Sequence, residues 1–162
     1  MNKRLIPAIA ALLVIPALAW GQGDNTNGAS EVTAHQILSG YEKGAAQPMH
    51  KVVRSNDALS DLLQQVYSGQ AAPQPPHIDF SKQVLVFYGL GSAMHRGDRV
   101  YVRSGSLDKG VLHVNVEIAK PGESCLQTHS LTAPFALAAL PFPAYDVKRA
   151  EYSISHKSYP CR

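Results

Sequence analysis

Strand candidates follow one another through the second half of the chain, and this succession constrains the fold more than any other feature. They occupy residues 84–88, 99–103, 112–118, 135–140 and 151–156. The first is continuously apolar, which is typical of a strand covered on both faces, and the next two alternate apolar and polar side chains. No helical pattern separates them after residue 83. The succession therefore favours an antiparallel sheet, sandwich or open barrel over a wound α/β sheet.

A single convincing helix comes before these strands. Residues 50–54 form a sixth strand candidate, and Ser55 begins a run of capping residues. Apolar residues then recur at helical spacing, at Leu59, Leu62, Leu63 and Val66. The three prolines within residues 70–76 predict a loop. The expected fold class is mainly β (α+β): an antiparallel sheet or sandwich of about six strands with one amphipathic helix.

Residues 1–19 have the pattern of a removable secretion signal. Lys3 and Arg4 give a positive start, residues 5–19 carry no charge, and Ala17-Leu18-Ala19 offers small residues for a signal peptidase. The uncharged run is shorter than the roughly 20 residues that cross a bilayer as a helix. A membrane anchor is the alternative, but we expect no stable membrane span. The mature protein is expected to be periplasmic or secreted.

Residues 20–48 are expected to form a flexible N-terminal tether. The segment from Gly21 to Gly28 is polar and glycine-rich and has little to bury. The pattern of residues 34–41 also allows a weak helical turn. Residues 49–162 then form the ordered β domain, and a mature chain of this length fits one domain.

The charge of the mature chain is close to neutral. The full chain has 15 Lys+Arg and 12 Asp+Glu, and the signal contains Lys3, Arg4 and no acidic residue, which leaves 13 − 12 = +1. Proteins that bind nucleic acid through phosphates carry clustered basic residues, and the sequence shows no such stripe. Nucleic acid is therefore not an expected partner.

Cys125 and Cys161 are the two cysteines of the chain. In an oxidising compartment an isolated pair most simply forms a disulfide. Closing a loop of about 36 residues would stabilise the fold by roughly 3–4 kcal/mol and hold the C-terminus. Two free thiols, or a catalytic Cys125 with His129 nearby, are the alternatives.

Three stretches of the sequence resemble the PrcB-like family. They are residues 77–91, from His77-Ile78-Asp79-Phe80 to Gly89-Leu90-Gly91, residues 112–122, and residues 132–137. The similarity covers roughly residues 49–156. The family is named for a subunit of a secreted bacterial protease complex, so the resemblance implies a small exported protein with a β-rich domain and no assigned catalysis. The family's Gly-Gly-Tyr type turn is missing here, where only Gly97 stands nearby.

No catalytic or metal-binding motif stands out in the sequence. It has no Gly-x-Ser-x-Gly elbow and no His-Glu-x-x-His helix motif. His113, Asn115 and Glu117 would share one face of a strand, but zinc would need a third ligand from another strand. The polar outer face of a half-buried sheet is the ordinary explanation, and we prefer it. We expect no enzymatic activity, no metal and no cofactor.

The segment between residues 91 and 99 is the candidate partner-binding loop. Its candidate contact residues are Ser92, Met94, His95, Arg96, Gly97, Asp98 and Arg99. They show no alternation that would bury one side, and loops on a rigid β scaffold often carry binding. We expect the loop to be exposed and mobile. Arg96-Gly97-Asp98 is also a tripeptide read by some cell-adhesion receptors, although a simple exposed turn accounts for it.

These observations predict an exported, non-enzymatic protein-interaction domain. Its expected partner is another extracytoplasmic protein, and the family resemblance suggests a protease that it binds or stabilises. A small secreted protease inhibitor is the first alternative. An enzyme without a recognisable motif is the second.

Cleavage of the signal provides the first test. We expect the exported protein to begin at Trp20 or within a few residues of it, because Ala17 and Ala19 match the small-residue requirement of the peptidase. Intact mass or N-terminal sequencing of the exported protein measures this directly. A mature chain that still carries Lys3 and Arg4 would contradict the export hypothesis.

Overall fold

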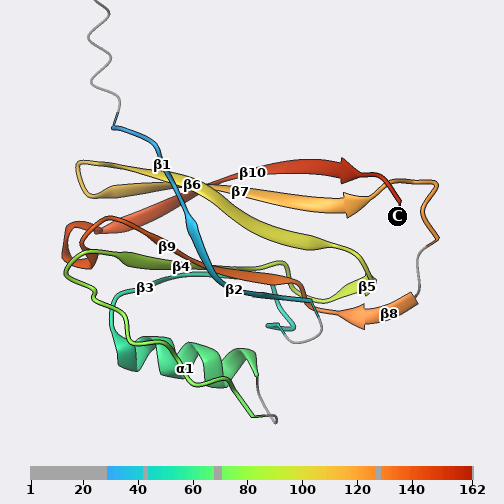
Figure 1. The fold of residues 1–162 in the computed structure, drawn as a ribbon, viewed down its shortest axis with the longest axis horizontal. Coiled ribbons are helices and arrows are strands. Elements are labelled where there is room, and N and C mark those ends of the chain that lie inside the picture. The colour runs from blue at the N-terminus through green and yellow to red at the C-terminus, as the bar shows by residue number, and fades with distance from the viewer. Residues whose placement is uncertain (1–28, 42–43, 68–70, 127–128, 162) are drawn as a thin grey trace, which may run out of the picture.

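The computed structural model describes residues 29–41, 44–67, 71–126 and 129–161. The expected signal, residues 1–19, lies outside these ranges. The described chain forms three layers (Figure 1): an outer sheet, a middle sheet and one α-helix. A small two-stranded sheet extends one end of the sandwich. The prediction of a mainly β sandwich with one amphipathic helix is confirmed, although the described residues form ten strands instead of about six.

The outer sheet has the strand order β1-β6-β7-β10. Its strands are β1 (Val32–Thr33), β6 (Arg99–Asp108), β7 (Val111–Pro121) and β10 (Arg149–Tyr159). The β6–β7 hairpin turns at Lys109 and Gly110, whose φ angles of 47° and 85° lie in the left-handed region that such turns need.

Strand β10 runs parallel to β7, which differs from the antiparallel expectation. The reason is the route of the chain, which crosses from the middle sheet through a short 3-10 helix, Ala144–Asp146. It reaches the outer sheet beside the β6–β7 turn, where the amide of Lys148 donates to the Gly110 carbonyl oxygen at 2.8 Å. Strand β10 therefore starts at the same end of the sheet as β7.

The middle sheet has the strand order β2-β9-β4-β3, and all its pairs are antiparallel. Its strands are β2 (His35–Gly40), β9 (Phe135–Leu140), β4 (Val84–Gly89) and β3 (Met49–Val53). Strands β4 and β9 are central and covered on both faces, which explains why both are almost wholly apolar.

The expected tether over residues 20–48 is wrong for its second half, because β1 and β2 lie within it. The chain passes from the outer sheet into the middle sheet here, with the amide of Ala34 donating to the Arg103 carbonyl oxygen. Val32 packs between the two sheets and Ile37 against the helix side. The suggested helical turn is likewise a strand, because these apolar contacts stabilise an extended chain.

Helix α1 (Asn56–Val66) covers the far face of the middle sheet. The Ser55 hydroxyl caps it by accepting from the Ala58 amide at 3.1 Å, as the sequence predicted. The Asn56 side chain both donates to and accepts from the backbone of Ile78, which fixes the returning loop. Within the described ranges no helix is both long and apolar enough to cross a bilayer.

Two apolar cores result from these layers. One lies between the sheets and contains alternate residues of β4, such as Val84 and Val86, with the inward face of β7. The other lies between the middle sheet and α1, where Phe87 stacks on Phe135 at a centroid distance of 5.7 Å. The middle sheet thus contributes to both.

Replacing Phe87 by alanine should be strongly destabilising. The ring is 1% exposed and anchors the core under α1. We expect the free energy of unfolding to fall by about 3–5 kcal/mol, the range for removing a buried aromatic ring. Urea denaturation measures the loss. The control Tyr145→Ala, at a residue that is 75% exposed, should change stability by no more than about 0.5 kcal/mol.

Candidate functional site

The expected binding loop is more ordered than predicted. Ala93–His95 forms strand β5, which pairs with β8 (His129–Thr132) in the small sheet. Ser92 holds the start of this segment against Ala46, because its amide and its hydroxyl both donate to the Ala46 carbonyl oxygen. The assignment of residues 91–99 to a loop is therefore wrong for Ala93–His95.

The side chains of this segment divide into exposed and inward-facing ones. Ser92, Met94, Arg96 and Arg99 are exposed, whereas Gly97 is half-buried. Asp98 is only 8% exposed, so Arg96-Gly97-Asp98 cannot present both its charges as an adhesion motif. The side chain of His95 lies outside what the structure describes.

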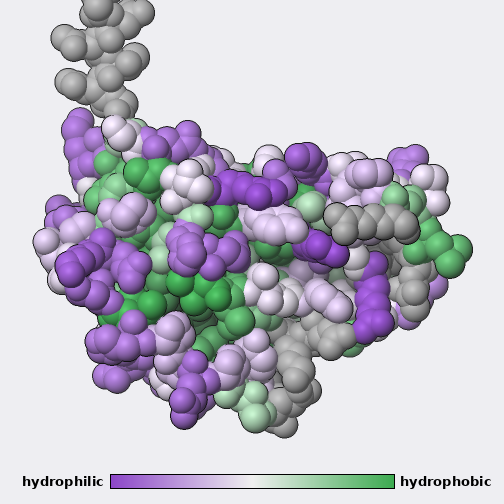
Figure 2. All heavy atoms as spheres, in the orientation of Figure 1, coloured by the Kyte–Doolittle hydropathy of each residue, from purple (hydrophilic) through white to green (hydrophobic). Residues whose placement is uncertain are grey.

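Two apolar side chains are exposed on neighbouring strands of the small sheet, and we call this pair the apolar tip. Met94 follows Ala93 and Leu131 precedes Thr132, the two residues that pair across the ladder, and the register shifts just beyond them. Met94 is 64% exposed and Leu131 is 70% exposed, while Thr132 faces inward. On the side seen in Figure 2, by contrast, hydrophilic residues prevail over the outer sheet.

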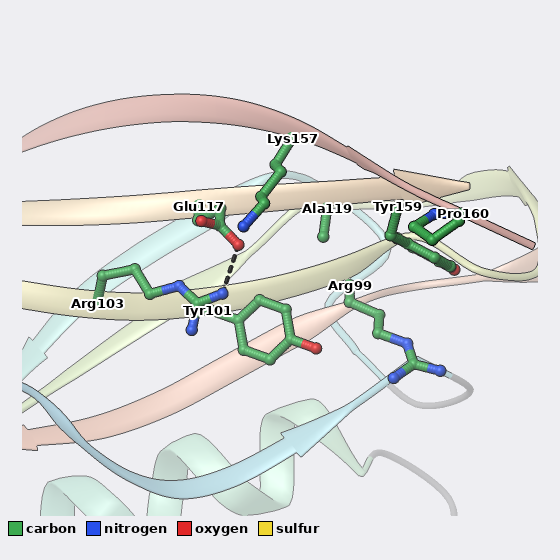
Figure 3. A pocket seen from close by; sticks show the side chains of 8 residues that line it. All are labelled: Arg99, Tyr101, Arg103, Glu117, Ala119, Lys157, Tyr159 and Pro160. Atoms are coloured by element: carbon green, nitrogen blue, oxygen red, sulfur yellow. Dashed lines mark hydrogen bonds and ion pairs between the residues drawn. The ribbon is translucent and has the colours of Figure 1, made fainter. Parts of the chain in front are cut away.

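A pocket of about 430 Å³ lies on the uncovered face of the outer sheet, and we call it the basic pocket (Figure 3). Strand β6 presents Arg99, Tyr101 and Arg103 to it, because alternate residues of a strand share a face. The full lining is Arg99, Tyr101, Arg103, Glu117, Ala119, Lys157, Tyr159 and Pro160. Three cationic side chains against one carboxylate give this lining a net charge of +2.

The cations of the basic pocket are held by aromatic rings and by one carboxylate. The Arg103 guanidinium pairs with Glu117 and lies 4.3 Å from the centre of the Tyr101 ring. The hydrogen bond from Arg103 lowers the pKa of Glu117, and the charges of Arg103 and Lys157 add to the effect. The Arg99 guanidinium lies against an aromatic ring instead, 5.7 Å from the Tyr159 ring centre.

The wall of the basic pocket depends on the C-terminal tail. The Tyr159 hydroxyl donates to the Gly97 carbonyl oxygen at 2.6 Å, and the Gly122 amide donates to the Tyr159 carbonyl oxygen at 2.9 Å. Gly97 has φ +131°, and a Cβ there would lie 2.5 Å from the Pro121 ring. Only glycine fits this close approach, so the segment before β6 and the tail interlock.

Cys125 and Cys161 stand at disulfide distance, with their Cα atoms 5.3 Å apart. This spacing fulfils the geometric condition for the expected bond. The bridge joins the turn after β7 to the residue next to Pro160, which lines the basic pocket. The predicted pairing thus closes the tail beside the pocket.

Two smaller hollows, of about 260 and 240 Å³, adjoin the basic pocket. Arg99 lines all three, and Tyr41 and Asp98 line the two smaller ones. The Arg96 guanidinium lies 5.9 Å from the Tyr41 ring centre. Cationic and aromatic groups therefore continue from the basic pocket towards the segment that leads to the apolar tip.

The polar residues singled out on β7 occupy the outward face, as their alternation predicted. His113 lies 3.5 Å from a Glu151 carboxylate oxygen, and Asn115 donates to Glu31 at 2.6 Å. Hydrogen bonds from Ser104 and Asn115 lower the pKa of Glu31. Among the described residues, no three His, Cys, Asp or Glu side chains are grouped closely enough to hold a metal ion.

Sequence reasoning missed the basic pocket. The alternation of Arg99, Tyr101 and Arg103 was visible and indicated a shared face. Lys157 and Tyr159 join them only because β10 lies parallel to β7, with Lys157 opposite Ala119. A signal for the parallel pairing is absent from the sequence.

No protein-family model matches this chain, and no curated protein and no solved structure shows significant similarity to it.

Removing the bridge should loosen the pocket wall. We expect Cys161→Ser to lower the free energy of unfolding by roughly 2–4 kcal/mol, because the unfolded chain is no longer cross-linked. Amide exchange at Tyr159 should also accelerate. Urea denaturation and hydrogen exchange measure both effects, and non-reducing mass spectrometry establishes the bond in the parent protein.

The double variant Cys125→Ser with Cys161→Ser is the matched control for this test. It should be as stable as the single variant, since each lacks the same cross-link. Two free thiols in a stable parent protein, oxidised normally, would contradict the disulfide.

Proposed function

We propose that this chain is an exported, non-enzymatic protein-interaction domain that binds another extracytoplasmic protein. The apolar tip and the basic pocket form its contact surface. The observation that carries the proposal is the exposed pair Met94 and Leu131 on a small sheet whose strand β5 leads, along the chain, to Arg99 of a pocket rich in arginine and tyrosine.

The apolar tip supplies the anchor. Exposed apolar side chains that stand together are costly to leave in water and commonly mark contact sites. A cross-strand ladder holds Met94 and Leu131, so little backbone order remains to be lost on binding. The flexible thioether of methionine also adapts to irregular partner surfaces.

The basic pocket supplies specificity. Arginine and tyrosine are the residue types that dominate binding energy at protein interfaces. Arg99 can offer a bidentate donor pair to a carboxylate, and Lys157 adds a second positive charge beside it. A partner that places acidic side chains here gains both hydrogen bonds and charge complementarity, so we propose an acidic patch on the partner.

Three features of the sequence and the structure support the extracytoplasmic location and the class of partner. Residues 1–19 read as a secretion signal, and the close approach of Cys125 and Cys161 suits an oxidising compartment. The resemblance to the PrcB-like family suggests that the partner is a secreted protease. In that case the domain prolongs the life of the protease by holding its folded form.

A panel of secreted serine and cysteine proteases tests this function. Each protease is incubated with the mature domain, and its remaining activity is followed over time. We expect the half-life of at least one protease to increase at unchanged initial activity. The variant Met94→Ser with Leu131→Ser should remove the effect, because it deletes the apolar tip.

Tyr145→Ser is the matched control, since it removes a side chain of comparable exposure from the 3-10 helix, outside the proposed contact surface. It should protect the protease as the parent domain does. Immediate loss of protease activity would instead assign the domain as an inhibitor. Protection that survives loss of the apolar tip would reject the proposed surface.

A further inference from the structure

Strand β10 leaves a long open edge on the outer sheet. It is the last strand in the order β1-β6-β7-β10, and it pairs with β7 through eleven consecutive residues without a register shift. Among the described residues no strand pairs with its other side. It also lacks the proline or bulge that usually protects such an edge.

The second half of β10 extends beyond the core. Ala150 and Tyr152 still pack against the residues between the sheets. Residues 153–158, by contrast, are exposed on both faces of the strand. Ile154 is 48% exposed in the middle of the strand. An apolar side chain at the centre of an open edge is a favourable point for a second strand to add.

The sequence of β10 is complementary to itself when it is reversed about Ile154. In an antiparallel pair centred there, Glu151 stands opposite Lys157 of the second copy, and Lys157 opposite Glu151. Arg149 meets Tyr159 of the other strand, and Ile154 meets its own equivalent. Opposite charges, a cation with an aromatic ring and a central apolar pair are the combinations that stabilise cross-strand neighbours.

We propose that the chain forms a twofold homodimer in which two β10 strands pair antiparallel about Ile154 and join two outer sheets into one. A twofold axis through this point makes the contact closed. Each pair of unlike residues then occurs twice, and Ile154 meets its own equivalent. The contact leaves the apolar tip free and shares only Lys157 and Tyr159 with the lining of the basic pocket. It goes beyond the proposed partner binding because its occupant is a second copy of this chain.

A second copy suits this edge better than an unrelated strand does. Glu151 and Lys157 lie three residues on either side of Ile154. A reversed copy of the same strand therefore places an opposite charge against each of them. Glu151 and Lys157 both face outward, as shown by their pairing with His113 and Ala119 of β7. The edge strand β3 of the middle sheet has only five residues, which leaves less backbone to pair.

Charge reversal tests the register. The mature protein is studied by sedimentation velocity over a range of concentrations to obtain the dimer dissociation constant. Glu151→Lys and Lys157→Glu should each raise this constant by about tenfold, since two attractive pairs become repulsive. The double variant, and also an equimolar mixture of the two single variants, should restore dimer formation. Ile154→Lys should abolish it.

Lys51→Glu is the matched control, because it reverses an exposed lysine on the edge strand of the other sheet. It should leave the dissociation constant unchanged, and circular dichroism should show that every variant is folded. A parent protein that stays monomeric at high micromolar concentration would overturn the proposal. So would a dimer that withstands Ile154→Lys, or single reversals that the double variant does not rescue.

Discussion

The middle sheet lies between two apolar layers, and the rest of the structure depends on this double coverage. Residues of β4 and β9 alternate between the core under the outer sheet and the core under α1. Almost every position of these strands is therefore apolar, and alanines of β9 such as Ala136 and Ala138 let the outer sheet approach closely. The helix and the outer sheet pack on opposite faces of the middle sheet.

Because the central strands β4 and β9 are covered on both faces, the outer sheet offers the larger exposed face. One face of β6 and β7 closes the core, with residues such as Val100 and Val114, and the other meets solvent. Polar side chains on that second face cost the fold little, so they can serve recognition. The basic pocket, with Arg99 and Tyr101, occupies the end of this face where the tail and the small sheet converge. The core and the basic pocket are thus on opposite sides of the same strands.

The sequence predicts the parts of this fold that depend on local pattern. Continuous apolarity revealed β4, alternation revealed β7, and a cap followed by helical spacing revealed α1. Short strands such as β1 and β5 lacked enough residues to show a period, and their partners are distant in sequence. The cysteine pair could be inferred by elimination, since two cysteines allow one pairing. The basic pocket could not, because Lys157 reaches Arg99 only through the parallel placement of β10.

The parallel placement of β10 has a consequence for the order in which the molecule is assembled. The β6–β7 hairpin closes through a tight turn, whereas Arg149 meets Val111 only after the chain has passed through β8 and β9. Long loops close more slowly than tight turns, so we expect β10 to dock late in folding. Lys157 and Tyr159 belong to that strand. The basic pocket is then completed among the last events of folding, so binding that depends on this pocket would report on a fully folded chain.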